Sequence, residues 1–104
     1  MVARGAIWWH EPHDEKRRPV LILSRNEGVA VLNQVIAVPA TTVVRSIPTE
    51  VHLGRADGMP TECVLTLDNL RPVRTAHLTE HITTLDGARL AAVCEALAFA
   101  VDCS

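Results

Sequence analysis

Two arginines and a proline stand directly before an unbroken apolar run in residues 17–24, and few local structures accommodate that order. Pro19 lacks a backbone N–H and has a fixed φ, so it suits the first residue of a strand and favours an extended Arg18. Residues 20–23 include no polar side chain that could face water, which predicts a strand covered on both faces. Arg18 would then lie at the mouth of a buried strand, where its guanidinium can reach an anion.

A second buried strand is expected at residues 35–39. Pro39 comes late in this apolar stretch, which favours a strand end or a bulge over pairing in the middle of a ladder. Thr41 and Thr42 follow a buried strand directly, just as Arg18 precedes one. If the two strands are antiparallel neighbours, these ends meet.

The remaining sequence alternates short strand patterns with turn chemistry and ends in a helical pattern. Further strands are predicted at residues 5–9, 49–53, 62–67 and 80–85. The connections are expected to be loops or turns at residues 10–16, 26–28 and 54–60, an approach strand or helical turn at 29–32, and one helical turn at 74–78. From Asp86 onward the apolar period becomes that of a helix, with an apolar face formed by Leu90, Val93, Cys94, Leu97, Ala98 and Val101. Short strands before one helix, without a βαβ rhythm, predict a mostly β, α+β fold, an antiparallel barrel-like domain with a C-terminal helix.

Composition narrows the class of protein. A length of 104 residues predicts a single domain, residues 1–104, and the apolar fraction of 48% is that of an ordinary globular protein. Because no apolar run reaches the length of a membrane span and no leader pattern opens the chain, we expect a cytoplasmic protein. The net charge of −2 excludes a strongly polybasic nucleic-acid binder, so such contacts depend on local positive charge, which is found at Lys16, Arg17, Arg18, Arg25 and Arg45.

Cysteine and histidine spacing gives no reason to expect a metal or a cofactor. The three cysteines are an odd number without C-x-x-C spacing, unlike a disulfide scaffold or a structural zinc site. Cys63 and Cys94 fall at apolar-patterned positions and are expected to be buried. His10 and His13 lack a convincing third metal ligand, since the other histidines lie in separate predicted elements.

Two pairs of side chains suit the binding or cleavage of a phosphoester. Each pair also has a purely structural explanation. The Arg18 guanidinium and the Thr41 hydroxyl suit a phosphate, or they are a surface arginine and a strand-end threonine with no shared task. His10 and His13 can exchange protons near neutral pH, or they are solvated loop residues.

A third candidate lies at the end of the strand at residues 62–67. Asp68 and Asn69 provide a carboxylate beside an amide, or they are a turn-forming pair that bonds neighbouring backbone groups. Arg71 is expected to pair with Asp68 or Glu80 for structural reasons.

Five short segments, taken in order, resemble the pattern of one protein family. They are Arg4-Gly5-Ala6-Ile7-Trp8, Arg18-Pro19-Val20-Leu21-Ile22-Leu23-Ser24, Val38-Pro39-Ala40-Thr41-Thr42, Ile47-Pro48-Thr49-Glu50-Val51 and Leu67-Asp68-Asn69-Leu70-Arg71. Their order and spacing resemble the MazF/PemK family of toxin endoribonucleases over most of the chain.

This resemblance implies a small SH3-like antiparallel barrel of the CcdB/PemK type that forms a homodimer. It also implies metal-independent cleavage of single-stranded RNA at short sequences, without a cofactor, and neutralisation by a cognate antitoxin whose tail folds along the dimer. By the family motifs, Arg18 and Thr41 are the catalytic pair, and Asp68 matches an aspartate that some members use. The flanking residues expected to bind substrate are Thr42, Arg17, Lys16, His13 and Asn69.

The chain departs from the family pattern in its first loop, which is short and has Glu15-Lys16 roughly in place of a Gly-x-Glu-Gln-Gly motif. Thr66 stands where some relatives have an arginine. The mechanistic hypothesis is attack by the RNA's own 2′-hydroxyl, which leaves a 2′,3′-cyclic phosphate and a 5′-hydroxyl. Because arginine is almost always protonated, the base is a loop histidine, a carboxylate or an RNA group.

Two other functions are compatible with the same fold. CcdB-like toxins bind DNA gyrase through the last residues of the terminal helix, which here read Val101-Asp102-Cys103-Ser104. A degenerate member would bind only RNA or antitoxin. The presence of both Arg18-Pro19 and Thr41-Thr42 favours the nuclease.

Overall fold

Seven strands form one antiparallel sheet in the computed structural model, which describes residues 2–26 and 33–101. The strands run β4-β5-β3-β2-β1-β7 across the sheet, and β6 also pairs with β3. Their bounds are β1 (Ala6–His10), β2 (Arg18–Ile22), β3 (Gln34–Thr41), β4 (Glu50–Leu53), β5 (Cys63–Thr66), β6 (Arg71–Arg74) and β7 (Leu78–Thr84). Three 3-10 turns, η1 (Arg55–Asp57), η2 (Leu67–Asn69) and η3 (Thr75–His77), and the helix α2 (Gly87–Val101) complete the described elements.

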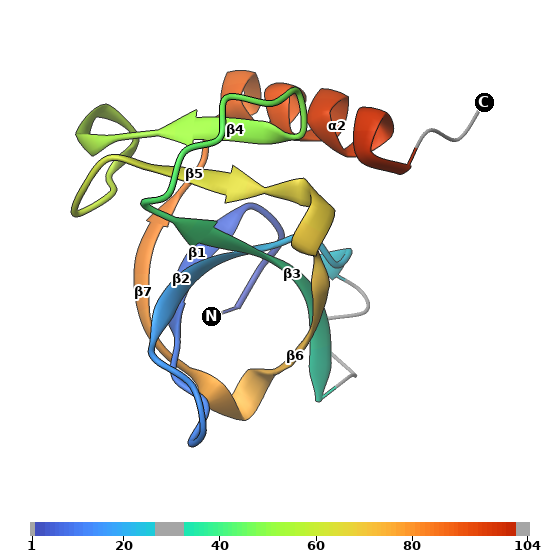
Figure 1. Ribbon diagram of the computed structural model, residues 1–104. Coiled ribbons are helices and arrows are strands. Elements are labelled where there is room, and N and C mark those ends of the chain that lie inside the picture. Colours follow the sequence, from blue (N-terminus) through green and yellow to red (C-terminus); the bar gives the residue numbers. More distant parts are fainter. Residues whose placement is uncertain (1, 27–32, 102–104) are drawn as a thin grey trace.

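The sheet curls into a ring. Figure 1 shows β7, β1, β2, β3 and β6 around one opening, with β4 and β5 beyond β3 and α2 lying along β4. The corner η3 joins β6 to β7 and brings the two sides of the ring together. The predicted mostly β, α+β fold with a C-terminal helix is confirmed.

Both faces of β2 are buried, as its sequence predicted. Val20, Leu21 and Ile22 are each at most 1% exposed. Leu21 belongs to a larger core that includes Val93 and Ala96 of α2. Val20 and Ile22 belong to a smaller cluster, here called the ring core, which consists of Val20, Ile22, Val35, Ala37, Val73 and Leu78.

The long strand β3 is shared between two parts of the sheet, and this corrects the expectation for Pro39. Pro39 lies inside β3 opposite Val20 of β2, not at a strand end or a bulge. Its carbonyl accepts a hydrogen bond from Thr66 Oγ1 at 3.1 Å, on the edge away from β2. The N–H and C=O of a strand residue point to the same edge, so the missing N–H costs β2 no hydrogen bond. On that edge β3 passes from pairing with β6 to pairing with β5, where a proline is tolerated.

The helix buries half of the face that its sequence predicted: Leu90, Val93 and Leu97 lie against the core, whereas Cys94, Ala98 and Val101 are exposed. Val93 and Ala96 are buried, and the residues partly buried against the same core are Leu90, Ala92, Leu97 and Ala100. Cys94 is exposed and Val101 is 56% exposed, so both expectations of burial were wrong. Nearly every residue of α2 is apolar, so periodicity did not single out one face. Small alanine side chains let the helix pack closely on β4 and η2, and this packing turned Cys94 outward.

Of the other predictions from the sequence, some are confirmed, and one strand was missed. Cys63 is buried as expected, and the helical turn after residue 74 is η3. Strand β6 was missed, because only four residues with Pro72 among them carry little strand pattern. Expectations for residues 27–32 and 102–104 lie outside the described residues. Within the described part of the chain, no helix has both the length and the apolarity to cross a membrane.

Candidate functional site

The strand register brings three polar side chains into one row at an opening of the ring. His10 in β1 is the Cα partner of Arg18 in β2. Strands β2 and β3 are antiparallel neighbours whose pairing ends at Val20 and Pro39. Arg18 and Thr41 lie two residues beyond this same end of the ladder, where Thr41 already pairs with Val64 of β5. Residues directly opposite each other, such as His10 and Arg18, share a face of the sheet. We call His10, Arg18 and Thr41 the mouth row.

Arg18 is the exposed member of the mouth row. It begins β2, and the buried residues that follow fix the backbone from which its side chain projects. None of the five ion pairs found among residues 2–26 and 33–101 includes Arg18. Its guanidinium therefore keeps its fork of donors for an external anion such as a phosphate.

Thr41 ends β3 and is half-buried. Its Oγ1 accepts a hydrogen bond from the backbone N–H of Val43 at 3.1 Å. That bond orients the side chain and uses a lone pair of the oxygen, so the hydroxyl hydrogen remains available to donate to a ligand. The adjacent Thr42 is exposed.

His10 is buried, whereas the sequence suggested a solvated loop residue. It is only 4% exposed, and among the described residues no hydrogen-bond partner reaches its Nδ1. Its ring centroid lies 5.9 Å from that of His77, which lies 5.9 Å from that of the exposed His13. In the described parts of the chain, no three His, Cys, Asp or Glu side chains are grouped to hold a metal ion.

Burial and neighbouring charges keep the His10 ring neutral. Burial is the main cause that lowers the pKa of His10 below its ordinary value of 6.5. Arg71, His77 and Arg18 lower this pKa further, while Glu15 opposes them. At neutral pH the mouth row therefore combines a neutral imidazole with a free guanidinium.

The loop between β1 and β2 joins His10 directly to Arg18 and carries three expected substrate-binding residues. The exposed Lys16 and His13 lie on it, and Arg17 stacks on Trp9 with its guanidinium carbon 4.0 Å from the ring centroid. Arg17 also lies 3.9 Å from a carboxylate oxygen of Glu11. These contacts set the loop beside the mouth row, and they tie up the Arg17 side chain in the free protein.

Asp68 forms its hydrogen bond and ion pair with residues other than those that its position in the sequence suggested. Its Oδ2 accepts a hydrogen bond from Thr49 Oγ1 at 2.5 Å and lies 4.0 Å from an Arg45 nitrogen. Arg71 pairs with Glu15, so the expected pairing with Asp68 or Glu80 was wrong. Asp68 thus joins η2 to the loop after β3, and the exposed Asn69 follows it.

A buried carboxylate fixes the loop that follows Thr41. Glu50 accepts hydrogen bonds from the backbone N–H groups of Arg45 and Ser46, at 3.0 and 2.9 Å, and from Arg45 Nε at 3.2 Å. Burial acts to raise the pKa of Glu50, but these hydrogen bonds outweigh it and hold the pKa below its ordinary value. The sequence analysis gave Glu50 no role of its own, although Glu50 lies in one of the five segments that resemble the family. By contrast, the alternation of Trp8 and His10 along β1 could have indicated that His10 faces inward.

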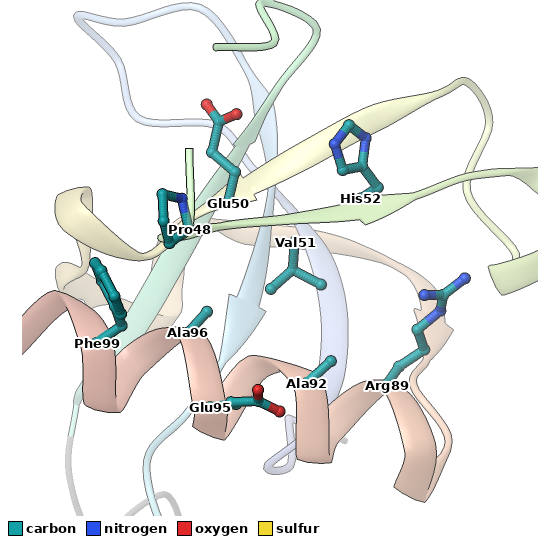
Figure 2. A pocket seen from close by; sticks show the side chains of 9 residues that line it. All are labelled: Pro48, Glu50, Val51, His52, Arg89, Ala92, Glu95, Ala96 and Phe99. Atoms are coloured by element: carbon teal, nitrogen blue, oxygen red, sulfur yellow. The ribbon is translucent and has the colours of Figure 1, made fainter. Parts of the chain in front are cut away.

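A second concave feature lies between β4 and α2. Figure 2 shows Phe99 beside Pro48 at one end of this groove and Arg89 near His52 at the other. The groove has a volume of about 410 Å³, and Phe99 is 63% exposed. An exposed aromatic ring beside a groove is typical of a surface that another molecule covers.

The sequence matches one protein family over nearly its whole length. A family model for the PemK-like, MazF-like toxin of type II toxin-antitoxin systems matches residues 3–101. The chain belongs to this toxin family. The resemblance carried by the five short segments is therefore confirmed.

Curated and solved MazF proteins are similar to the chain. A Mycobacterium tuberculosis protein described as probable endoribonuclease MazF5 is 38% identical over 103 residues, covering 98% of this chain and 94% of the relative. The solved M. tuberculosis toxin MazF-mt6 superposes with a TM-score of 0.87 at 31% identity, covering 95% of this chain and 98% of that one. A mycobacterial endoribonuclease in complex with its cognate antitoxin gives a TM-score of 0.90 at 27% identity, covering 100% and 98%.

The buried neutral His10 predicts how the stability of this MazF-family chain depends on pH. Below pH 6.5 the unfolded chain takes up a proton at His10 that the folded chain resists, because folding lowers the pKa. Stability contributed in this way is lost as the pH falls from about 6.5 toward the lower pKa of the folded state, with a slope of up to about 1.4 kcal/mol per pH unit. Urea unfolding followed by tryptophan fluorescence should show this slope in the wild type, reduced in His10→Gln. His52→Gln, exposed on β4, should retain it; equal slopes for wild type and His10→Gln would contradict the prediction.

Proposed function

We propose that this chain is the toxin of a type II toxin–antitoxin system and acts as an endoribonuclease on single-stranded RNA, inhibiting translation and growth. The observation that carries the proposal is that Arg18, which forms no ion pair with the described residues, lies at the same end of the β2–β3 ladder as the oriented Thr41 hydroxyl. A relative that is 38% identical is described as a probable endoribonuclease, which supports the same activity. The substrate we expect is single-stranded cytoplasmic RNA: messenger RNA, transfer RNA or ribosomal RNA.

The proposed reaction is attack by the RNA's 2′-hydroxyl on the adjacent phosphorus. The bond from the 2′-oxygen to phosphorus forms, and the bond from phosphorus to the 5′-oxygen breaks. Arg18 stabilises the charge that develops on the non-bridging oxygens, and Thr41 donates a hydrogen bond to one of them. We assign the 2′-hydroxyl proton to the neutral imidazole of His10, because His10 adjoins Arg18 in the mouth row. The leaving 5′-oxygen takes a proton from water, and the hydroxide that remains takes the proton from His10, which restores water and the neutral imidazole. The products are a 2′,3′-cyclic phosphate and a 5′-hydroxyl.

Other residues receive supporting roles in this proposal. Lys16, Arg17 and His13 on the β1–β2 loop would contact the RNA beside the scissile phosphate, together with Thr42. Asp68 and Asn69 lie next to the loop after β3, so we propose that they shape the substrate path without touching the phosphate. Positive charge from Arg18 supports a reaction that needs no metal ion or other cofactor.

We also propose that the toxin is a homodimer that a cognate antitoxin neutralises. Exposed Phe99 and Val101 on α2, at 63% and 56%, support a partner surface on the helix side of the molecule. A structural neighbour is described as an endoribonuclease in complex with its cognate antitoxin. An antitoxin tail with acidic residues would inhibit by pairing with Arg18.

The two alternative functions have less support than the ribonuclease. The family match and the mouth row favour the ribonuclease over a gyrase-binding toxin of the CcdB type. A degenerate member that only binds RNA or antitoxin would be expected to lack the unpaired arginine at the same end of the ladder as a threonine. RNA cleavage by the purified chain separates all three functions.

The purified protein should cut single-stranded RNA in the presence of EDTA, because the attacking group belongs to the RNA and the stabilising cation to Arg18. A DNA of the same sequence should survive, since it lacks the 2′-hydroxyl. Gel analysis of end-labelled substrates checks both outcomes, and 3′-end mapping identifies the cyclic phosphate. Cleavage that appears only after a divalent ion is added would remove this mechanism.

Arg18→Ala should lower the cleavage rate by about a hundredfold or more, as expected for the loss of a donor to the developing oxyanion. Arg18→Lys should stay at least about tenfold below wild type, because a point charge does not reproduce the two-pronged contact. The exposed position of Arg18 predicts melting temperatures near that of wild type. Arg55→Lys, in η1 between β4 and β5, is the matched control. Wild-type rates for Arg18→Lys would show that charge alone suffices.

Sedimentation at low micromolar concentration should give the mass of a dimer. Phe99→Glu should weaken dimerisation at least about tenfold, because it buries a charge in the proposed apolar contact. Ala76→Glu, exposed on η3 away from α2, should leave the dimer intact. A monomer with full ribonuclease activity would contradict the dimer and leave the catalytic proposal standing.

A further inference from the structure

An ion pair ties the β1–β2 loop to strand β6 across the mouth of the ring. Arg71 Nη1 lies 3.4 Å from Glu15 Oε1, and Nη2 lies 3.3 Å from Oε2. The two residues are 56 positions apart, so the contact exists only once the ring has formed. Two parallel N–H···O bonds from one guanidinium are also the geometry in which arginine binds phosphate.

Arg71 faces the same opening as the mouth row. Its Cα partner in β3 is Ala37, a member of the ring core, and opposed residues share a face. The charges of Arg71 and Arg18 both act on the buried His10 ring. Two guanidinium groups from opposite sides of the ring therefore lie close to one neutral histidine.

We propose that Arg71 binds a second RNA phosphate, beside the one held by Arg18, and that Glu15 occupies this position in the free protein as an internal mimic of phosphate. The inference rests on the proposed function, because it assigns the substrate of the same opening. Incoming RNA replaces the Glu15 carboxylate with phosphate oxygens and releases the loop from β6.

The exposure of the pair makes this exchange possible. The Arg71 and Glu15 side chains are 40% and 42% exposed, so water and salt screen their attraction. A guanidinium that is already oriented by a carboxylate can pass to a phosphate without losing its fork geometry. RNA that engages Arg18 and Arg71 together displaces Glu15 more readily than a single phosphate does, which favours a polynucleotide over mononucleotides.

The test is a double-mutant cycle on binding, which needs no cleavage. The probe is a short random-sequence 2′-O-methyl oligoribonucleotide, which cannot be cut, and its affinity is measured by fluorescence anisotropy over a range of salt. Glu15→Gln should bind about threefold tighter or more, because the internal competitor is weakened. Arg71→Gln should bind more weakly, and its salt slope should fall by about 0.7, the value for one phosphate contact in a single strand.

In the Arg71→Gln background, Glu15→Gln should gain less than about twofold. Asp14→Asn is the matched control: it removes the same charge from the neighbouring exposed position, and should have little effect. Arg71→Lys keeps the charge but loses the fork, so its affinity should fall between those of Arg71→Gln and wild type. Thermal melting confirms that each variant is folded.

A gain from Glu15→Gln that persists without Arg71, or that Asp14→Asn reproduces, would show that Glu15 acts only through net charge and would overturn the proposal. An unchanged affinity and salt slope in Arg71→Gln would do the same. The proposed function fails separately: a wild-type protein that shows the Arg71-dependent binding but never cuts RNA keeps this inference and loses the ribonuclease.

Discussion

The burial of β2 on both faces is the constraint on which the rest of the molecule depends. Leu21 belongs to the larger core with α2, and Val20 and Ile22 belong to the ring core, so a one-residue slip in register would move each of these side chains into the other core and disturb the packing of both. A fixed β2 in turn fixes Arg18, its first residue, relative to β1 and β3. The position of one exposed cation is thus determined by three buried aliphatic side chains.

Burial of His10 and the ion pair of Arg71 limit the positive charge around the opening of the ring. His10 is kept neutral by burial and by the cations on either side of it, which avoids a third positive charge inside the ring. Arg71 has an internal carboxylate for a partner, whereas Arg18 has none among the described ion pairs. At the opening, the described residues thus leave the Arg18 guanidinium without an ion-pair partner, and the proposed second phosphate would replace Glu15 at Arg71.

On the helix side of the molecule, the main surface feature is a groove and not a row of cations. The groove between β4 and α2 is lined by both apolar and polar side chains, the polar ones being Glu50, His52, Arg89 and Glu95, and it ends at an exposed phenylalanine. Glu50 separates this side from the opening: its buried carboxylate holds the loop after Thr41 while its neighbours line the groove.

The sequence by itself determined the strands with continuous apolar character and the terminal helix, which follow from periodicity and proline chemistry acting between near neighbours. The five short motifs determined the family. Tertiary structure decided how deeply His10 is buried, and it alone decided that Arg71 pairs with Glu15. It also decided which face of α2 is covered, because an almost uniformly apolar helix leaves that choice to packing. Contacts between residues more than fifty positions apart depend on how the ring closes, and no local pattern encodes that closure.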